Sequence, residues 1–192
     1  MTFGPPASSP ARATVLLPHV EVSRVGTWNG DAYGPDDFNV MVEAFGVGFC
    51  WPSVYAVSHS DDGAPACGYV GDLKHVGGVL IADLEVDRVV LDAIRAGRLE
   101  HVSAEVRFGV NVQGQRFSRV LVGLALLGKG LRPAVSGLRC LQASLDPQFS
   151  ASPPPVPQER EQSPTGEQPR QALRPAALVV PCRYSARPVR RI

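Results

Sequence analysis

The spacing of apolar residues predicts helices in two parts of the chain. In PDDFNVMVEAFG, residues 35–46, apolar side chains recur at i, i+3, i+4 and i+7 from Phe38, between a Pro-Asp-Asp start and a final Gly. In DRVVLDAIRAGRL, residues 87–99, Asp87 is an expected N-cap and Gly97 an expected terminator. The apolar stripe of this second helix consists of Val90, Ala93 and Ile94. We expect both stripes to pack against the core.

Elsewhere the pattern favours strands, because runs rich in Val, Leu and aromatic residues are separated by turn residues. The runs are PSVYAVSH (52–59), CGYVGDLKHV (67–76), GVLIADLEV (78–86), HVSAEVRFGV (101–110) and FSRVLVGLALL (117–127). The pair Gly77-Gly78 suits a tight hairpin turn between the second and third. Since the order is β, α, several β, α, then β, we predict an α+β domain with a mostly antiparallel sheet or barrel.

Composition divides the chain into three parts. Residues 1–14 are rich in Pro, Ser and Ala and form an expected flexible N-terminus, while residues 15–145 have the pattern of one folded domain. Residues 146–192 form an expected Pro-rich tail, most of which buries too little apolar surface to offset its ordering entropy. Its last stretch, AALVVPCRYSARPVRRI, regains apolar residues and adds Arg, which suits either a short docking peptide or an unstructured end.

Charge and cysteine content narrow the function classes. The formal net charge is +1, which gives no reason to expect nucleic acid or an anionic membrane as a partner. There is no apolar run long enough for a membrane span and no pattern of a secretory signal. We therefore expect the protein to be in a reducing cytoplasm. The four cysteines, Cys50, Cys67, Cys140 and Cys182, lack metal-site spacing. We expect them to be reduced thiols, and we expect no metal and no cofactor.

One predicted strand carries residues that can transfer protons. Strand alternation in HVSAEV places His101, Ser103 and Glu105 on one face and three apolar residues on the other. The strip is either a chemical site or a polar, solvent-facing edge of an ordinary strand.

A second candidate, His59, follows an apolar run and precedes the turn sequence SDDG. A neutral imidazole there could accept the proton of a serine hydroxyl, or His59 could be an ordinary surface residue. Glu105, Asp61, Asp62 and Glu100 are all open as the group that would orient the imidazole. No G-x-S-x-G motif occurs, which disfavours an α/β-hydrolase.

Six segments occur in an order that is typical of one family. They are GTWNG (26–30), PDDFNVMVEAF (35–45), VYAVSHSDDGAPACGYVGDL (54–73), GVLIADLEVD (78–87), VVLDAIRAGRLEHVSAEV (89–106) and LVGLALLGKGLRPAV (121–135). This order resembles the Mu-type phage head maturation protease (prohead protease) family over residues 20–135. Two positions depart from the family pattern: Ser58 stands where Asp is frequent, and Ala104 replaces the Pro of its "SPE" strand.

The resemblance implies a herpesvirus assemblin-like β-barrel surrounded by helices, and a serine protease. It maps the nucleophile to Ser103, the base to His59 and a third catalytic member to Glu105. The implied substrates are scaffold and capsid precursor proteins inside phage proheads in the host cytoplasm. A homo-oligomer is compatible with this interpretation.

Further expectations follow from the protease interpretation. Backbone N–H groups near Gly128 and Gly130 are a candidate oxyanion site, with Lys129 or Arg132 either assisting or only solubilising the loop. The small residues Ala143-Ser144, at the boundary with the tail, are a candidate self-cleavage site.

Two alternative functions stay open. One is a catalytically inactive head-assembly or scaffold-associated protein that keeps the same fold. The other is a small β-rich binding module unrelated to phage.

Overall fold

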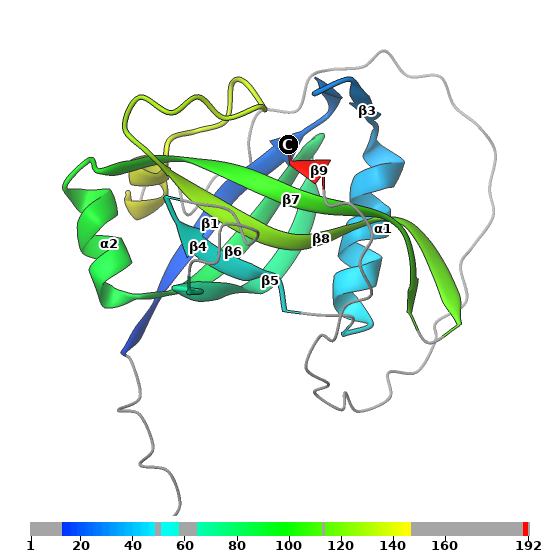
Figure 1. The fold of residues 1–192 in the computed structure, drawn as a ribbon, viewed down its shortest axis with the longest axis horizontal. Helices are drawn as coiled ribbons and strands as arrows, with labels where there is room; N and C mark the ends of the chain where they lie inside the picture. The colour runs from blue at the N-terminus through cyan, green and yellow to red at the C-terminus, as the bar shows by residue number, and fades with distance from the viewer. Residues whose placement is uncertain (1–12, 49–50, 58–64, 113, 147–189, 192) are drawn as a thin grey trace, which may run out of the picture.

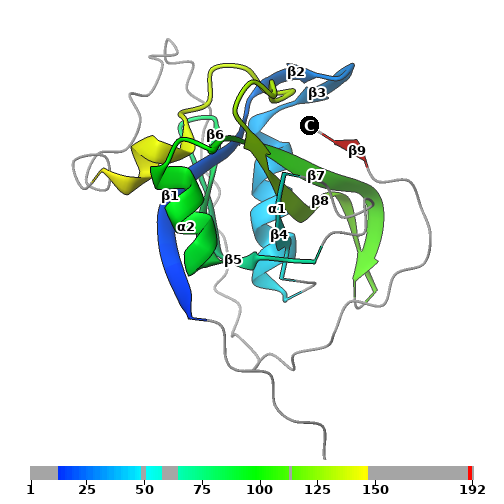
Figure 2. The same ribbon diagram turned by 60° about the vertical axis from the view of Figure 1, so that its left-hand side comes forward.

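The computed structural model describes residues 13–48, 51–57, 65–112, 114–146 and 190–191, and shows an α+β fold in which one large curled sheet carries helices at its two sides (Figure 1, Figure 2). The strands are β1 (Thr14–Arg24), β2 (Gly26–Trp28), β3 (Asp31–Tyr33), β4 (Ser53–Ala56), β5 (Gly68–Val76), β6 (Val79–Asp87), β7 (Leu99–Val112), β8 (Gln115–Gly128) and β9 (Arg190–Arg191). The helices are α1 (Pro35–Gly46), α2 (Arg88–Arg95) and the 3₁₀ helix η2 (Leu141–Leu145).

The large sheet has the strand order β1-β6-β5-β4-β8-β7-β9, and β2 and β3 form a separate hairpin. Every pairing in the described sheet is antiparallel except that of β4 with β8, which is parallel. The prediction of an α+β domain with a mostly antiparallel sheet is therefore confirmed.

A closed barrel, which the resemblance implied, is not found. β1 lies at one end of the strand order and β7 near the other, and no ladder of hydrogen bonds joins them in the described residues. Both strands instead contact η2, whose Leu141 is buried in the core. In a closed barrel, β1 and β7 would be joined by backbone hydrogen bonds. Here both strands pack against the side chains of η2 instead, and the sheet is open.

The two predicted helices are confirmed. α1 starts where the Asp37 carboxylate accepts the Gly34 N–H at 2.8 Å, and it buries Phe38 and Met41. α2 follows its predicted N-cap Asp87, and Gly97 takes the left-handed conformation at φ +65° just beyond it. The predicted turn between β5 and β6 is also confirmed, because both of its glycines have positive φ.

The pattern of apolar residues gave no bounds for β1, because Pro18 interrupts it. The register against β6 shifts between Leu17 and Val20, so Pro18 lies in a bulge where no ladder N–H is needed. Within this bulge His19 has φ +55°, and its backbone N–H donates to the Asp83 carboxylate at 2.8 Å.

The ends of the chain are described only in part. The predicted flexible N-terminus lies outside the described residues except for residues 13 and 14. In the predicted tail, residues 147–189 and 192 lie outside them, whereas Arg190–Arg191 form β9 against Glu105–Val106 of β7. None of the described helices is long and apolar enough to cross a membrane.

Candidate active site

Ser103 lies on β7, on the face of the sheet that points away from the main core. Its neighbours along the strand, Val102 and Ala104, belong to that core, so alternation turns Ser103 to the other side. The serine pairs with Ala125 of β8, which in turn pairs with Tyr55 of β4. The predicted alternation of β7 is thus confirmed. Ser103 is only 5% exposed, however, so it is not part of a solvent-facing strip.

Glu105 is also on this face and is 1% exposed. It pairs with Gly123 of β8, and its carboxylate lies over that glycine, 2.9 Å from the position a Cβ would take there. The same position is 3.5 Å from the Ser53 carbonyl oxygen of β4. The side chain therefore extends from β7 across β8, and the missing side chain of Gly123 makes the space for it.

A continuous row of paired residues crosses the sheet at the level of Glu105. From β6 to β9 the row contains Glu85, Tyr69, Ser53, Gly123, Glu105 and Arg191. The neighbouring row contains Ser103, Ala125 and Tyr55. Small residues on β8 thus separate the polar residues of β7 from those of β4, on the face opposite the core.

His59 itself lies outside the described residues, so its predicted approach to Ser103 stays a prediction. The described chain stops at Val57, which has φ +68° and whose N–H donates to the Leu126 carbonyl at 2.8 Å. It resumes at residue 65, and the Cys67 N–H donates to the Val54 carbonyl at 2.8 Å. Both ends of the segment that contains His59 are therefore attached at the same end of β4.

The topology relates this end of β4 to Ser103. Only β8 separates β4 from β7, a lateral spacing of about 10 Å for two strand intervals. The row of Ser103 crosses β4 at Tyr55, two residues before Val57. The row of Glu105 crosses it at Ser53, two residues earlier still, so Glu105 is farther than Ser103 from where the chain leaves β4.

His101 is the described imidazole on this strip. It is half-buried and pairs with Leu127, one residue beyond Leu126, to which Val57 is bonded. The register of β7 against β8 shifts just before it, between Leu99 and His101. His101 is therefore level with the end of β4, about 7 Å along the strand from Ser103.

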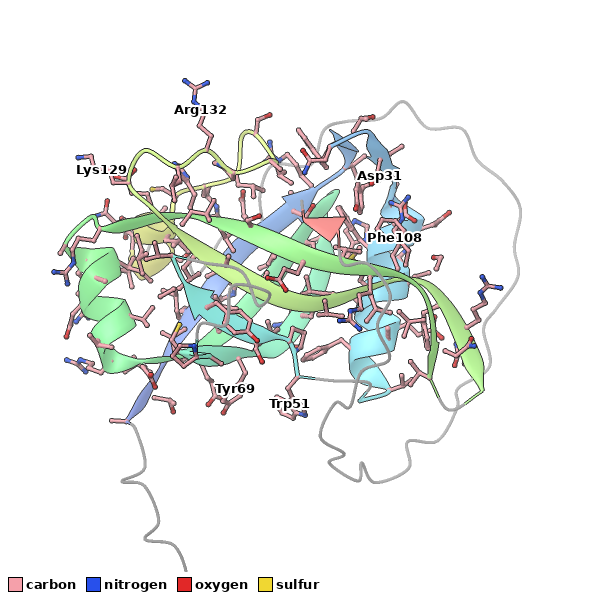
Figure 3. The ribbon with its side chains drawn as sticks, viewed as in Figure 1. Asp31, Trp51, Tyr69, Phe108, Lys129 and Arg132 are labelled. Atoms are coloured by element: carbon pink, nitrogen blue, oxygen red, sulfur yellow. The ribbon has the colours of Figure 1, made fainter. Side chains whose placement is uncertain are left out.

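The proposed oxyanion loop is set apart from Ser103. Gly128 pairs with Leu99, four residues before the serine on β7, and the Lys129 N–H already donates to the Arg98 carbonyl at 3.2 Å. Lys129 and Arg132 are exposed and project outward from the loop in Figure 3. The geometry gives no support to an oxyanion role for the Lys129 amide, nor to catalytic assistance by either side chain.

The predicted self-cleavage site lies in a short helix, and both of its residues are partly exposed. Ala143 and Ser144 lie within η2, and the Ser144 hydroxyl donates to the His19 carbonyl at 3.5 Å. Leu141 anchors the same turn in the core. Cleavage between Ala143 and Ser144 would require η2 to unwind first.

Sequence reasoning missed an aromatic group near the same face. Trp51 is 53% exposed and meets Tyr69 edge-on, with ring centroids 5.5 Å apart, and both project from one margin of the molecule in Figure 3. The Tyr69 hydroxyl donates to the Glu85 carboxylate, and this hydrogen bond, together with burial and the nearby negative charge, raises the pKa of Tyr69. The alternation of Trp51, Ser53 and Tyr55 was the available signal.

The described residues hold no cluster of three or more His, Cys, Asp or Glu side chains that could bind a metal ion. Neither Cys67 nor Cys140 is in a disulfide, and the Cys67 thiol donates to the Val54 carbonyl at 3.3 Å. Cys50 and Cys182 lie outside the described residues. Comparison of the chain with protein-family models, curated proteins and solved structures found no match.

Proposed function

We propose that the protein is a serine endopeptidase that cleaves scaffold and capsid precursor proteins during phage head maturation. The observation that carries the proposal is the shared row of Ser103 and Tyr55, because His59 follows Tyr55 by only four residues. The proposal brings together a serine and a histidine that are 44 positions apart in the sequence. The order of motifs that resembles prohead proteases supports the same pair.

The mechanism follows from general acyl-transfer chemistry. The Ser103 hydroxyl attacks the scissile carbonyl while His59 accepts its proton, and an acyl-enzyme forms. His59 then gives the proton to the leaving amine, and water hydrolyses the acyl-enzyme. Confinement of enzyme and substrate in a prohead raises their effective concentration, so modest intrinsic activity would suffice.

Glu105 is proposed as the third member of the site. Its buried carboxylate is on the same face as Ser103 and favours a positive charge on a nearby imidazole. His101 is the competing candidate, because it is level with the end of β4 whereas Glu105 is not. The variants Glu105→Gln and His101→Gln distinguish the two candidates. Substitution of the residue that is the third member should lower the cleavage rate far more than substitution of the other.

A second candidate function is an inactive head-assembly protein of the same fold. It is favoured by the burial of Ser103, since a nucleophile that is 5% exposed leaves little room for a substrate carbonyl. The two functions differ in whether a covalent step occurs at this serine.

Co-expression with a capsid precursor tests the proposal. The wild-type chain and Ser118→Ala, a control on an exposed serine of β8, should cleave the precursor, whereas Ser103→Ala and His59→Gln should leave it intact. Gel electrophoresis and mass spectrometry of the products give the readout. An intact precursor with the wild-type chain under assembling conditions would overturn the protease proposal and support the inactive assembly protein.

A further inference from the structure

The outer edge of β7 is covered at one place by a segment from the far end of the chain. β7 pairs with β8 along most of its length, and in the described residues the strand that pairs with its other edge is β9 (Figure 1, Figure 2). The pairing joins Arg191 to Glu105 and Arg190 to Val106, in antiparallel register. A strand edge offers unpaired N–H and C=O groups, which another extended chain can bind.

This contact is immediately beside the candidate nucleophile. In an antiparallel pair, each step toward the C-terminus of the added chain is one step back along β7. Arg191 is opposite Glu105, so an extended chain that continued this register would reach Ser103 two residues later. The edge that holds β9 is therefore the edge along which a peptide would approach Ser103.

The pairing fixes the register of the docked segment. The docked segment belongs to the run Arg-Pro-Val-Arg-Arg, residues 187–191, and the backbone of Arg191 is in register with that of Glu105. Backbone pairing supplies the affinity in this mode of recognition, and the register of side chains supplies the selectivity.

Covalent connection favours the chain's own segment over a free peptide. Residues 147–189 join the folded domain to β9, and a connection of that length spans far more than a single domain when extended. An attached segment competes with free peptides at an effective concentration that the length of the connection sets.

We propose that the β7 edge at Glu105–Val106 is a docking site for an extended peptide, occupied by the chain's own Arg190–Arg191 segment. Another extended chain whose register beside Ser103 also covers Glu105 and Val106 must displace this segment. The docking site stands on the β7–β9 pairing alone. Its consequence for catalysis, that the segment competes with substrate, rests on the proposed function.

Peptide binding tests the docking site without any catalytic step. Both proteins carry Ser103→Ala; one is the full chain and the other ends at residue 189. A fluorescein-labelled peptide of residues 186–192 is titrated into each, with fluorescence anisotropy as the readout. We expect the shortened chain to bind the peptide at least ten times more tightly than the full chain, in which the edge is occupied.

Two control peptides identify the mode of binding. A peptide with Arg190→Pro should lose binding, because proline disrupts strand pairing, whereas a peptide with Arg190→Lys and Arg191→Lys should retain it. Hydrogen exchange of the β7 amides should also be faster in the shortened chain. Equal binding by the two proteins, absence of binding by the shortened chain, or unchanged binding of the proline peptide would overturn the proposal.

The outcome is independent of whether the protein is a protease. Failure of the precursor to be cleaved contradicts the function, while loss of the anisotropy difference contradicts the docking site. If both proposals hold, the chain that ends at residue 189 and keeps Ser103 should react with a fluorophosphonate about ten times faster than the full chain.

Discussion

The carboxylate of Glu105 occupies the space above Gly123 on the neighbouring strand. A Cβ at residue 123 would lie 2.9 Å from Oε2 and 3.3 Å from Cδ of Glu105, closer than side-chain atoms normally approach. Glycine at this position is therefore what permits a buried carboxylate to cross β8 toward β4. The effects of substituting Glu105 and Gly123 should therefore depend on each other, and single and double substitutions can test this.

Gly123→Ala should displace the Glu105 side chain and destabilise the protein by about 1–3 kcal/mol, the usual range for overpacking. Gly71→Ala is the matched control on β5, since its Cβ would be 3.5 Å from the nearest atom, an ordinary contact. That control should change stability by less than about 1 kcal/mol.

A double-mutant cycle separates displacement of the carboxylate from other effects of the added methyl group. In Glu105→Ala the space is vacated, so adding Gly123→Ala should be less destabilising than in the wild-type chain. Chemical denaturation of the four proteins gives the coupling. Strictly additive effects would show that Glu105 and Gly123 do not share this space.

The Glu21–Arg139 pair should hold the loop after β8 onto β1. The Glu21 side chain is 3% exposed, and its carboxylate accepts the Arg139 Nε–H at 2.6 Å and the Arg139 backbone N–H at 3.0 Å. Arg139→Ala removes the nearer guanidinium partner of this buried carboxylate and leaves Arg24, whose Nη2 is 3.8 Å from Oε2, so we expect a loss of about 2 kcal/mol.

The exposed Arg132 of the same loop supplies the control for this prediction. Arg132→Ala should change the free energy of unfolding by no more than about 0.5 kcal/mol. Equal effects of the two substitutions in urea denaturation would show that the buried pair does not stabilise the fold.

The Tyr69–Glu85 hydrogen bond should give the protein an alkaline-sensitive contribution to stability. Hydrogen bonding to the Glu85 carboxylate is the largest cause that raises the pKa of Tyr69 above its ordinary value of 10.0. Since the folded-state pKa is the higher one, the contribution is fully present below about pH 10 and is lost as the pH rises through the folded-state pKa.

The comparison that checks this prediction is between the wild-type chain and Tyr69→Phe, unfolded in urea at several pH values. At pH 8 the wild-type chain should be more stable by about 1 kcal/mol, and the difference should shrink above pH 10. A difference that does not change between pH 8 and pH 11 would contradict the assignment.

Local features of this fold are predictable from sequence because neighbouring residues determine them. The spacing of Phe38 and Met41 predicts α1, and the paired glycines 77 and 78 predict the hairpin of β5 and β6. The alternation around Ser103 likewise predicts which face of β7 carries the polar residues.

Pairings between distant segments are not predictable in this way. The parallel contact of β4 with β8 and the contact of Glu21 with Arg139, 118 residues apart, depend on how the whole chain folds. Burial of Ser103 and Glu105 is also a tertiary property, since an alternating strand looks the same whether its polar face is covered or in solvent. β9 is only two residues long, so no periodicity marks it.

The central claim is that Ser103 is a nucleophile activated by His59. The most direct measurement is labelling of the folded protein with a fluorophosphonate, followed by mass spectrometry of the tryptic peptide of residues 99–107. We expect a single adduct on Ser103 that is lost in His59→Gln and retained in His75→Gln. The His75 imidazole in the wild-type chain is instead 2.9 Å from the Asn39 side chain. No adduct on Ser103, or labelling that persists without His59, would contradict it.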